Sequence, residues 1–229
     1  MKYSILVCLI VVTSVVLVAP RVTGQTPALR EGVSVQLAEA SNAVAFPAAD
    51  NADAWIIAIT ADGGLYFGVR PVTSEQLQEQ MKITPRRRDA RLYIKADARA
   101  PFSAVKQALH AAHEDLFETA VLLTQPRRDD SPQAIVPPYG LEITLALPAA
   151  NVTLVQLQNS GSSSPVLKVN DQELAWAGLQ SALAQASLGQ SRKIVVIEAD
   201  GSLPAATVMR VIDVSRLIRA NVVISLTDL

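Results

Sequence analysis

The stretch that decides the fold is RLYIKAD, at residues 91–97. It is a short, mainly apolar run that ends in Ala-Asp, and from Pro101 onward the apolar residues recur with helical spacing. The same pattern returns as IVVIEAD at residues 194–200, followed by Pro204. Each stretch predicts a strand that leads into a helix whose first residue is a proline.

The neighbourhoods of these two stretches also align. Positions 91–124 align with positions 194–227 without a gap, and seven pairs are identical where chance gives about two. The identical pairs are Ile94/Ile197, Ala96/Ala199, Asp97/Asp200, Pro101/Pro204, Val105/Val208, Leu123/Leu226 and Thr124/Thr227. We therefore expect two copies of one structural unit.

Outward from these stretches, each unit is predicted to run β-β-β-α-β-α-β. The predicted segments of the first unit are Val33–Leu37, Trp55–Thr60, Leu65–Val69, a helix from Ser74 to about Lys82, residues 91–97, a helix from Pro101 and Ala120–Thr124. Those of the second are Leu141–Leu145, Val152–Leu157, Val166–Val169, a helix from Gln172 to about Ala186, residues 194–200, a helix from Pro204 and Val222–Thr227. Each helix has one apolar stripe, so the helices should cover one face of a small mixed sheet, an α+β fold.

Turn and cap residues support this order in the first unit. Asp62-Gly63 between two apolar runs predicts a tight hairpin. Thr73 or Ser74 is placed to cap the first helix.

A proline-rich break predicts the domain boundary. Residues 125–139 contain four prolines and two opposed charge pairs, which is typical of a linker. The expected organisation is an N-terminal segment at 1–24, a first domain at 32–124, this linker and a second domain at 140–229.

The N-terminal segment is apolar. Residues 3–19 carry no charge and would span about 25 Å as a helix, near the minimum for a bilayer. It is either an uncleaved single-pass anchor with Lys2 on the cytoplasmic side, or a signal peptide with a small-residue exit site at 22–24. Either alternative sends residues 25–229 out of the cytoplasm. Cys8 lies within the segment, where it is read as one more apolar residue.

Composition excludes several classes of function. The net charge is −1 and aromatic residues make up 4%, which argues against a nucleic-acid surface. One Cys and two His leave little material for a metal centre and rule out an intramolecular disulfide. We predict no catalytic residue, no cofactor and no metal.

Two pairs of residues invite a catalytic or metal-binding interpretation. His110 and His113 are three residues apart, with Glu114 and Glu118 nearby, but the predicted apolar stripe lies elsewhere on the helix, so a solvated polar face is expected. Asp97 and Asp200 each precede a helix, where a carboxylate accepts backbone N–H groups, so a capping role is expected rather than catalysis.

Three further motifs are weak. The arginines at 86–88 and 127–128 are offset by neighbouring aspartates and predict solvated loops rather than lipid contacts. Residues 161–164 lack the second glycine of a nucleophile elbow. Residues 151–153 match a glycosylation acceptor at a strand edge, which we do not expect to be used.

The ordered set of landmarks resembles the periplasmic domain of the ExbD/TolR family of biopolymer transport proteins. The matching features in the first unit are the Asp62-Gly63 hairpin, Leu77 in the first helix, Ile94-Lys-Ala-Asp97 with Pro101, and the closing strand Val121-Leu-Leu-Thr124. The second unit repeats the last two as Ile197-Glu-Ala-Asp200 with Pro204 and Ile224-Ser-Leu-Thr227.

The resemblance implies one transmembrane helix with a proton-exchanging aspartate and a multi-span channel partner. This chain departs from that pattern, because it has no cytoplasmic tail beyond residues 1–2, carries two predicted domains, and has no Asp or Glu in residues 3–19. Moving a charge across the membrane is worth about 2.3 kcal/mol per 100 mV, and harvesting that energy needs a group that titrates inside the bilayer.

We therefore expect a non-enzymatic, membrane-anchored binding or scaffold protein whose two domains dock as an internal pseudo-dimer. An exposed sheet edge is also expected to accept a partner's extended segment. The alternative is a subunit of a proton-gradient-energised complex that acts with a channel partner. A third hypothesis is a secreted enzyme of unknown reaction.

Overall fold

The computed structural model describes residues 32–87, 89–126, 138–145, 151–161 and 164–226. The residues from Gly32 onward form one compact unit by their contacts. The predicted apolar segment at 3–19 and most of the predicted linker lie outside the described residues.

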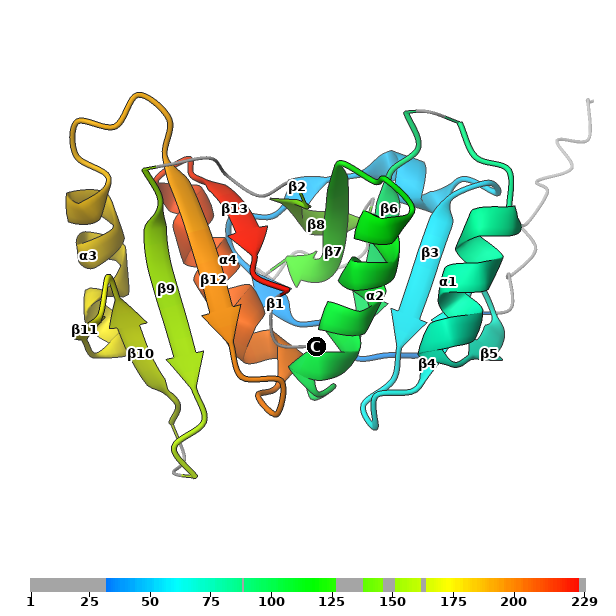
Figure 1. The fold of residues 1–229 in the computed structure, drawn as a ribbon, viewed down its shortest axis with the longest axis horizontal. Helices are drawn as coiled ribbons and strands as arrows, with labels where there is room; N and C mark the ends of the chain where they lie inside the picture. Colours follow the sequence, from blue (N-terminus) through cyan, green and yellow to red (C-terminus); the bar gives the residue numbers. More distant parts are fainter. Residues whose placement is uncertain (1–31, 88, 127–137, 146–150, 162–163, 227–229) are drawn as a thin grey trace, which may run out of the picture. The chain divides into compact units, whose positions relative to one another are not determined.

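The described residues form an α+β fold, as predicted, with four α-helices (Figure 1). Their strands belong to one sheet, in place of the two separate small sheets that the sequence predicts. The strands are β1 Glu39–Ala40, β2 Val44–Ala45, β3 Trp55–Ile59, β4 Leu65–Phe67, β5 Arg70–Val72, β6 Leu92–Ala96, β7 Thr119–Pro126, β8 Tyr139–Thr144, β9 Thr153–Gln158, β10 Val166–Val169, β11 Gln172–Glu173, β12 Ile194–Ala199 and β13 Asn221–Ile224. The helices are α1 Ser74–Ile83, α2 Phe102–Glu114, α3 Leu179–Ala186 and α4 Ala205–Leu217, with 3-10 turns η1 Pro47–Asp50 and η2 Trp176–Gly178.

The strand order is symmetric about β8. Along its main path the order is β11-β10-β9-β12-β13-β8-β7-β6-β3-β4-β5, with five strands on each side of β8. The two short strands off this path are β1, which pairs with β7, and β2, which pairs with β8. β8 pairs antiparallel with β7 and parallel with β13. Figure 1 shows β7 and β8 between the two outer groups of strands. We call the part before the linker the first half and the part from β8 onward the second half.

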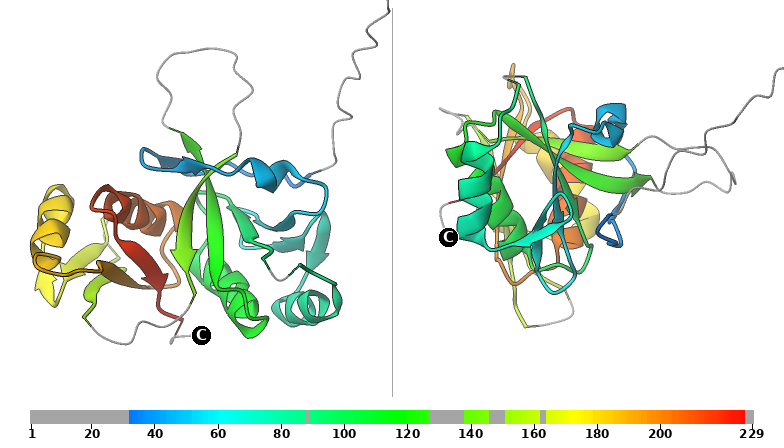
Figure 2. Two further views of the ribbon diagram at one scale, coloured as in Figure 1. Left: turned by 90° about the horizontal axis from the view of Figure 1, so that it is seen from above. Right: turned by 90° about the vertical axis from the view of Figure 1, so that its right-hand side faces the viewer.

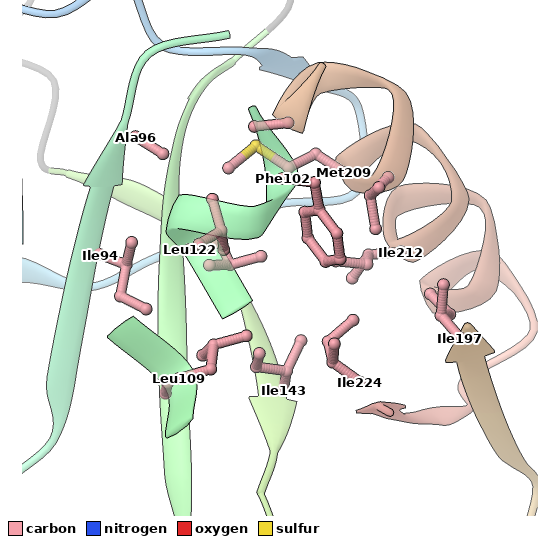
Figure 3. Close-up of a cluster of buried hydrophobic side chains, with 14 of the residues drawn as sticks. Ile94, Ala96, Phe102, Leu109, Leu122, Ile143, Ile197, Met209, Ile212 and Ile224 are labelled. Carbon is pink, nitrogen blue, oxygen red and sulfur yellow. The ribbon is translucent and has the colours of Figure 1, made fainter. Parts of the chain in front are cut away.

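All four helices pack on one face of this sheet. One cluster of buried apolar side chains contains residues of α1, α2, α3 and α4 together with alternate residues of the central strands. Leu122 of β7 and Leu141 of β8 are register partners within it, and both are fully buried. Figure 3 shows Phe102 of α2 facing Met209 and Ile212 of α4. The two halves therefore share one core.

The opposite face of β6 and β7 is covered by the chain that precedes β3. Phe46 and Ala49, from η1 and the residue before it, pack against Tyr93, Val121 and Leu123 in a second, smaller cluster. The rings of Phe46 and Tyr93 meet edge to face at 6.3 Å. Figure 2 shows this N-terminal segment running across the strands on the side away from α1 and α2.

Most predicted elements of the first half are confirmed. β3 and β4 form the hairpin with Ile59 opposite Leu65, and Gly63 takes φ +88° in the turn. Thr73 caps α1 in a capping box, because its hydroxyl accepts from the Gln76 N–H and the Gln76 side chain accepts from the Thr73 N–H.

The predicted first strand at Val33–Leu37 is wrong. This segment is extended but belongs to no ladder, and the only pairing nearby is the two-residue β1. Its alternation is nevertheless meaningful, because Val33 and Val35 are half-buried and Ser34 and Gln36 are exposed. Alternation of apolar and polar residues indicates an extended chain on an apolar surface. Such a chain need not pair with a neighbouring strand.

The predicted helix at Gln172–Ala186 is also wrong over its first half. Asn170 and Asp171 have positive φ and turn the chain into the short strand β11. The helix α3 begins at Leu179, one residue after Gly178. The Asn-Asp pair is the turn signal that the helical reading overlooked.

Candidate functional site

Asp97 is the most strongly held carboxylate of the described residues. It follows β6 directly and is 3% exposed. Arg99 donates to both of its oxygens, from Nε at 2.9 Å and from Nη2 at 3.0 Å, and the Arg99 backbone N–H donates at 3.0 Å. The Arg99 side chain holds the pKa of the Asp97 carboxyl well below its usual range, against the opposing effect of burial.

Asp97 also anchors the extended segment that precedes β1. The Gln36 N–H donates to Asp97 Oδ2 at 2.9 Å, and the Gln36 carbonyl accepts from the Ala98 N–H at 2.7 Å. Lys95 Nζ donates to the Val33 carbonyl at 3.0 Å. The end of β6 therefore binds a stretch of main chain by a reciprocal pair of bonds and one lysine. We call residues 33–36 the strap.

Asp200 takes the corresponding place after β12. Its Oδ1 accepts from the Ser202 N–H and the Ser202 hydroxyl, both at 2.8 Å. These bonds lower the pKa of the Asp200 carboxyl, with smaller contributions from the Asn159 N–H and the charge of Lys106. The prediction that both aspartates accept backbone N–H groups is confirmed. Their donors lie in the loops and not in the helices, so the predicted capping of the helix itself is wrong.

The first N–H groups of α2 and α4 donate to carbonyls of the opposite half. Pro101 and Pro204 are the N-cap residues, and neither helix has a side-chain cap bond. The two prolines form an antiparallel bridge. Four backbone hydrogen bonds surround this bridge. The N–H groups of Phe102 and Ser103 donate to the carbonyls of Leu203 (2.8 Å) and Gly201 (2.9 Å). The N–H groups of Ala205 and Ala206 donate to the carbonyls of Ala100 (2.8 Å) and Ala98 (3.0 Å). First-turn N–H groups, which every helix leaves unpaired, are thus satisfied by the other half.

These four bonds have the same 103-residue offset as the sequence alignment. Adding 103 to Phe102 gives Ala205, and subtracting 103 from Leu203 gives Ala100, so the first bond maps onto the third. The second maps onto the fourth in the same way. In a two-fold symmetric dimer, every contact occurs twice, with the roles of the two subunits exchanged. The bonds of this junction repeat in the same way, so the junction resembles the isologous contact of such a dimer.

A cavity of about 420 Å³ lies beside Asp200, a size typical of binding pockets. Its walls include Gln156, Glu198, Asp200 and Gly201 of the second half. Lys106 of α2 also lines it, although the side chain belongs to the first half and is 3% exposed. Sequence reasoning missed Lys106, and the available signal was a lysine beside the apolar stripe of α2.

The histidines do not form a metal site with other described residues. His110 is half-buried and His113 exposed on α2. Within the described part of the chain, no three His, Cys, Asp or Glu side chains gather as a metal ion requires.

The arginine cluster divides into two environments. Arg87 pairs with Asp89 at 3.2 Å in an exposed loop, as predicted. Arg86 is not solvated as predicted, because it pairs with Asp115 at 3.2 Å and its guanidinium lies 4.3 Å from the centre of the Phe117 ring. Arg88 and residues 127–128 lie outside the described residues.

The remaining motifs add no site. Asn151 has positive φ and precedes β9, whereas residues 162–163 lie outside the described part of the chain. Among the described helices none is both long and apolar enough for a bilayer.

Comparison with known proteins gives one match. The profile of the family described as biopolymer transport protein ExbD/TolR matches residues 4–127, more than half of the chain. No curated protein matches, and no solved structure matches. The matched region ends one residue after β7 and contains Asp97, Pro101 and the strap. The chain belongs to the ExbD/TolR family of biopolymer transport proteins.

Proposed function

We propose that this protein is a non-enzymatic binding or scaffold component of a biopolymer transport system, with residues 3–19 as its anchor in the inner membrane and residues 25–229 in the periplasm. Family membership makes it a transport component. The anchor and the location rest on the uncharged run at 3–19 and on the family pattern.

The second half is proposed to act as a built-in partner of the first. The observation that carries this proposal is the reciprocal set of bonds between the α2 and α4 N-termini. Tethering two docking surfaces in one chain raises their effective concentration to about the millimolar range. Such a chain needs no second copy to complete the junction.

Light scattering on the full-length chain in detergent tests this arrangement. One polypeptide per particle is expected. A stable dimer whose halves exchange between chains, detected by cross-linking of differently tagged copies, would exclude the internal arrangement.

A second candidate function is that of a subunit in a proton-gradient-energised complex. The observation in its favour is that the family match begins at residue 4 and so includes most of the apolar segment. Against it, residues 3–19 contain no side chain that titrates near neutral pH within a bilayer. In this case a channel partner would supply the acidic group.

Replacement of residues 1–24 by an unrelated single-pass anchor separates the two candidates. A scaffold should retain transport, because only its periplasmic part is needed. Loss of transport, together with co-purification of the unmodified chain with a multi-span channel protein, would favour the energised subunit. Mass spectrometry of the mature N-terminus shows in parallel whether the segment is retained.

A further inference from the structure

The ends of β6 and β12 at the junction carry similar groups, but within the described part of the chain only the end of β6 is occupied, by the strap. At the end of β6, Asp97 and the Ala98 N–H hold the strap by its main chain. The residues that the 103-residue offset places in the same roles at the end of β12 are Asp200 and Gly201. In the second half this position is the 420 Å³ cavity.

The groups that bind main chain are present in that cavity. Asp200 accepts both Ser202 donors on Oδ1, and the Asn159 N–H adds a smaller interaction, so a carboxylate with about four acceptor sites has room for a further donor. Within the described residues the Gly201 N–H has no intramolecular acceptor, whereas its counterpart at Ala98 is bonded to the Gln36 carbonyl. The Gly201 carbonyl is already used by Ser103, as the Ala98 carbonyl is used by Ala206.

A lysine also faces the cavity. Lys106 lines it with a side chain that is 3% exposed as a whole, and its charge acts on Asp200. Its counterpart at the first site is Met209, so the lysine is specific to the second. A lysine ammonium group carries three donors, and a peptide carbonyl is a suitable acceptor for one of them.

Charge identifies the kind of peptide. Lys95, which donates to the strap carbonyl at the first site, is replaced by Glu198 at the second. Glu198 lies on the cavity wall, where Gln156 donates to it at 3.0 Å. A carboxylate at this position repels a carbonyl and attracts a basic side chain.

We propose that the cavity at the end of β12 is a docking site for an extended segment of a partner protein that carries a Lys or Arg residue opposite Glu198. The segment donates a backbone N–H to Asp200, accepts from the Gly201 N–H and from Lys106, and places its basic side chain against Glu198. In this binding mode an extended segment is held by its main chain at the end of a strand, as the strap is at the end of β6, with main-chain bonds for affinity and one charge for selection. The inference rests on the proposed binding role and names the chemistry of its partner.

The probe is a synthetic nine-residue peptide with the sequence of residues 32–40, in which V33K supplies the basic residue. The unmodified peptide is the comparison. Binding to the purified full-length chain is measured by fluorescence anisotropy, so a failure of transport in cells does not affect the result.

Three variants of the chain make the test specific. Glu198→Lys is expected to weaken the binding of the V33K peptide by about tenfold or more. It should strengthen the binding of the unmodified peptide, because it restores the arrangement found at Lys95. Asp200→Asn should weaken both peptides. Glu173→Lys, the same charge change on the exposed strand β11, should leave both unchanged.

Several results would overturn the proposal. One is equal binding of the V33K peptide to the parent chain and to Glu198→Lys, with circular dichroism showing both folded. Another is a loss of binding in Asp97→Asn alone, because the peptide would then be displacing the strap from the first site. A third is a dimer that forms through the strap of a second copy, which would assign the cavity to self-association.

Discussion

Asp97 is buried although its ionic partner Arg99 has a side chain that is 67% exposed. A carboxylate in such a position is tolerated only when hydrogen bonds replace its water. Arg99 and Gln36 provide them, and in doing so they fix the strap to the end of β6. At this scale the family landmark Ala-Asp is a clamp for main chain.

Asp97→Asn should destabilise the protein by about 1–2 kcal/mol at pH 7, since it removes charge-assisted bonds that have one exposed partner. The pKa of Asp97 is lowered in the folded state, so its contribution is fully present above the unfolded value near 3.9 and is lost as the pH falls toward the folded value. Urea unfolding of both proteins at pH 7 and pH 3 measures this, and the difference should shrink at pH 3. Asp89→Asn, in the exposed pair with Arg87, is the control and should change little.

Gly140→Ala should destabilise the chain by about 1–3 kcal/mol through overpacking. A Cβ atom at Gly140 would lie 2.5 Å from Val121 Cγ1 and 3.0 Å from the Leu122 carbonyl oxygen, where β8 crosses β7. Gly178→Ala is the matched control, because its nearest neighbour would be Leu174 at 3.7 Å. Chemical denaturation measures both, and equal stabilities would contradict the close packing of β7 on β8.

The elements show how the sheet is closed at its ends. The outermost strands β5 and β11 have three and two residues. Pro71 lies within β5 and has no N–H to offer another strand. Short edges and proline limit pairing with other chains. Partner binding is therefore expected at the junction and not along the outer edges.

Helix α1 depends on its capping box. Thr73→Ala removes the bond from the Gln76 N–H and should cost about 1 kcal/mol. Thr73→Ser keeps the hydroxyl and should restore most of the stability in thermal unfolding followed by circular dichroism. If serine and alanine behave alike, the cap contributes nothing at this position.

Elements with a strong local signal could be predicted from the sequence, and those set by distant contacts could not. The Asp62-Gly63 hairpin and the Thr73 cap are local, and both are found. The strap at 33–36 looks like a strand, but its partners Lys95 and Ala98 are about sixty residues away. Lys106 completes a cavity of the other half, which no window of sequence contains.

At the scale of the whole molecule, the two halves share a sheet and a core. Phe102 of the first half is 1% exposed and packs beside Met209 and Ile212 of the second. From β3 to β7 and from β9 to β13 the elements follow the same order, β-β-β-α-β-α-β. The domain boundaries at 32–124 and 140–229 stay a prediction. The shared core predicts that the two halves unfold together.

The two tryptophans allow this to be measured, since Trp55 lies in β3 and Trp176 in η2. Single-tryptophan variants, Trp176→Phe and Trp55→Phe, report on one half each. After correction for the stability of each variant by circular dichroism, the fluorescence transition of each should coincide with the loss of secondary structure.

Phe102→Ala extends the test, because it should lower the unfolding free energy seen by both reporters by about 3–5 kcal/mol. An effect confined to the Trp55 reporter would mean that the halves are energetically independent.

The central place of β8 also has a consequence for biosynthesis. The ribosome makes β7 before β8, so the newly made first half presents the bare edge of its longest strand. Translation of residues 127–144 takes about 1–4 s at ordinary rates, which is long compared with hairpin formation. During that interval the nascent polypeptide is exposed to strand capture by neighbouring chains, and a chaperone that shields β7 would raise the yield of the finished protein.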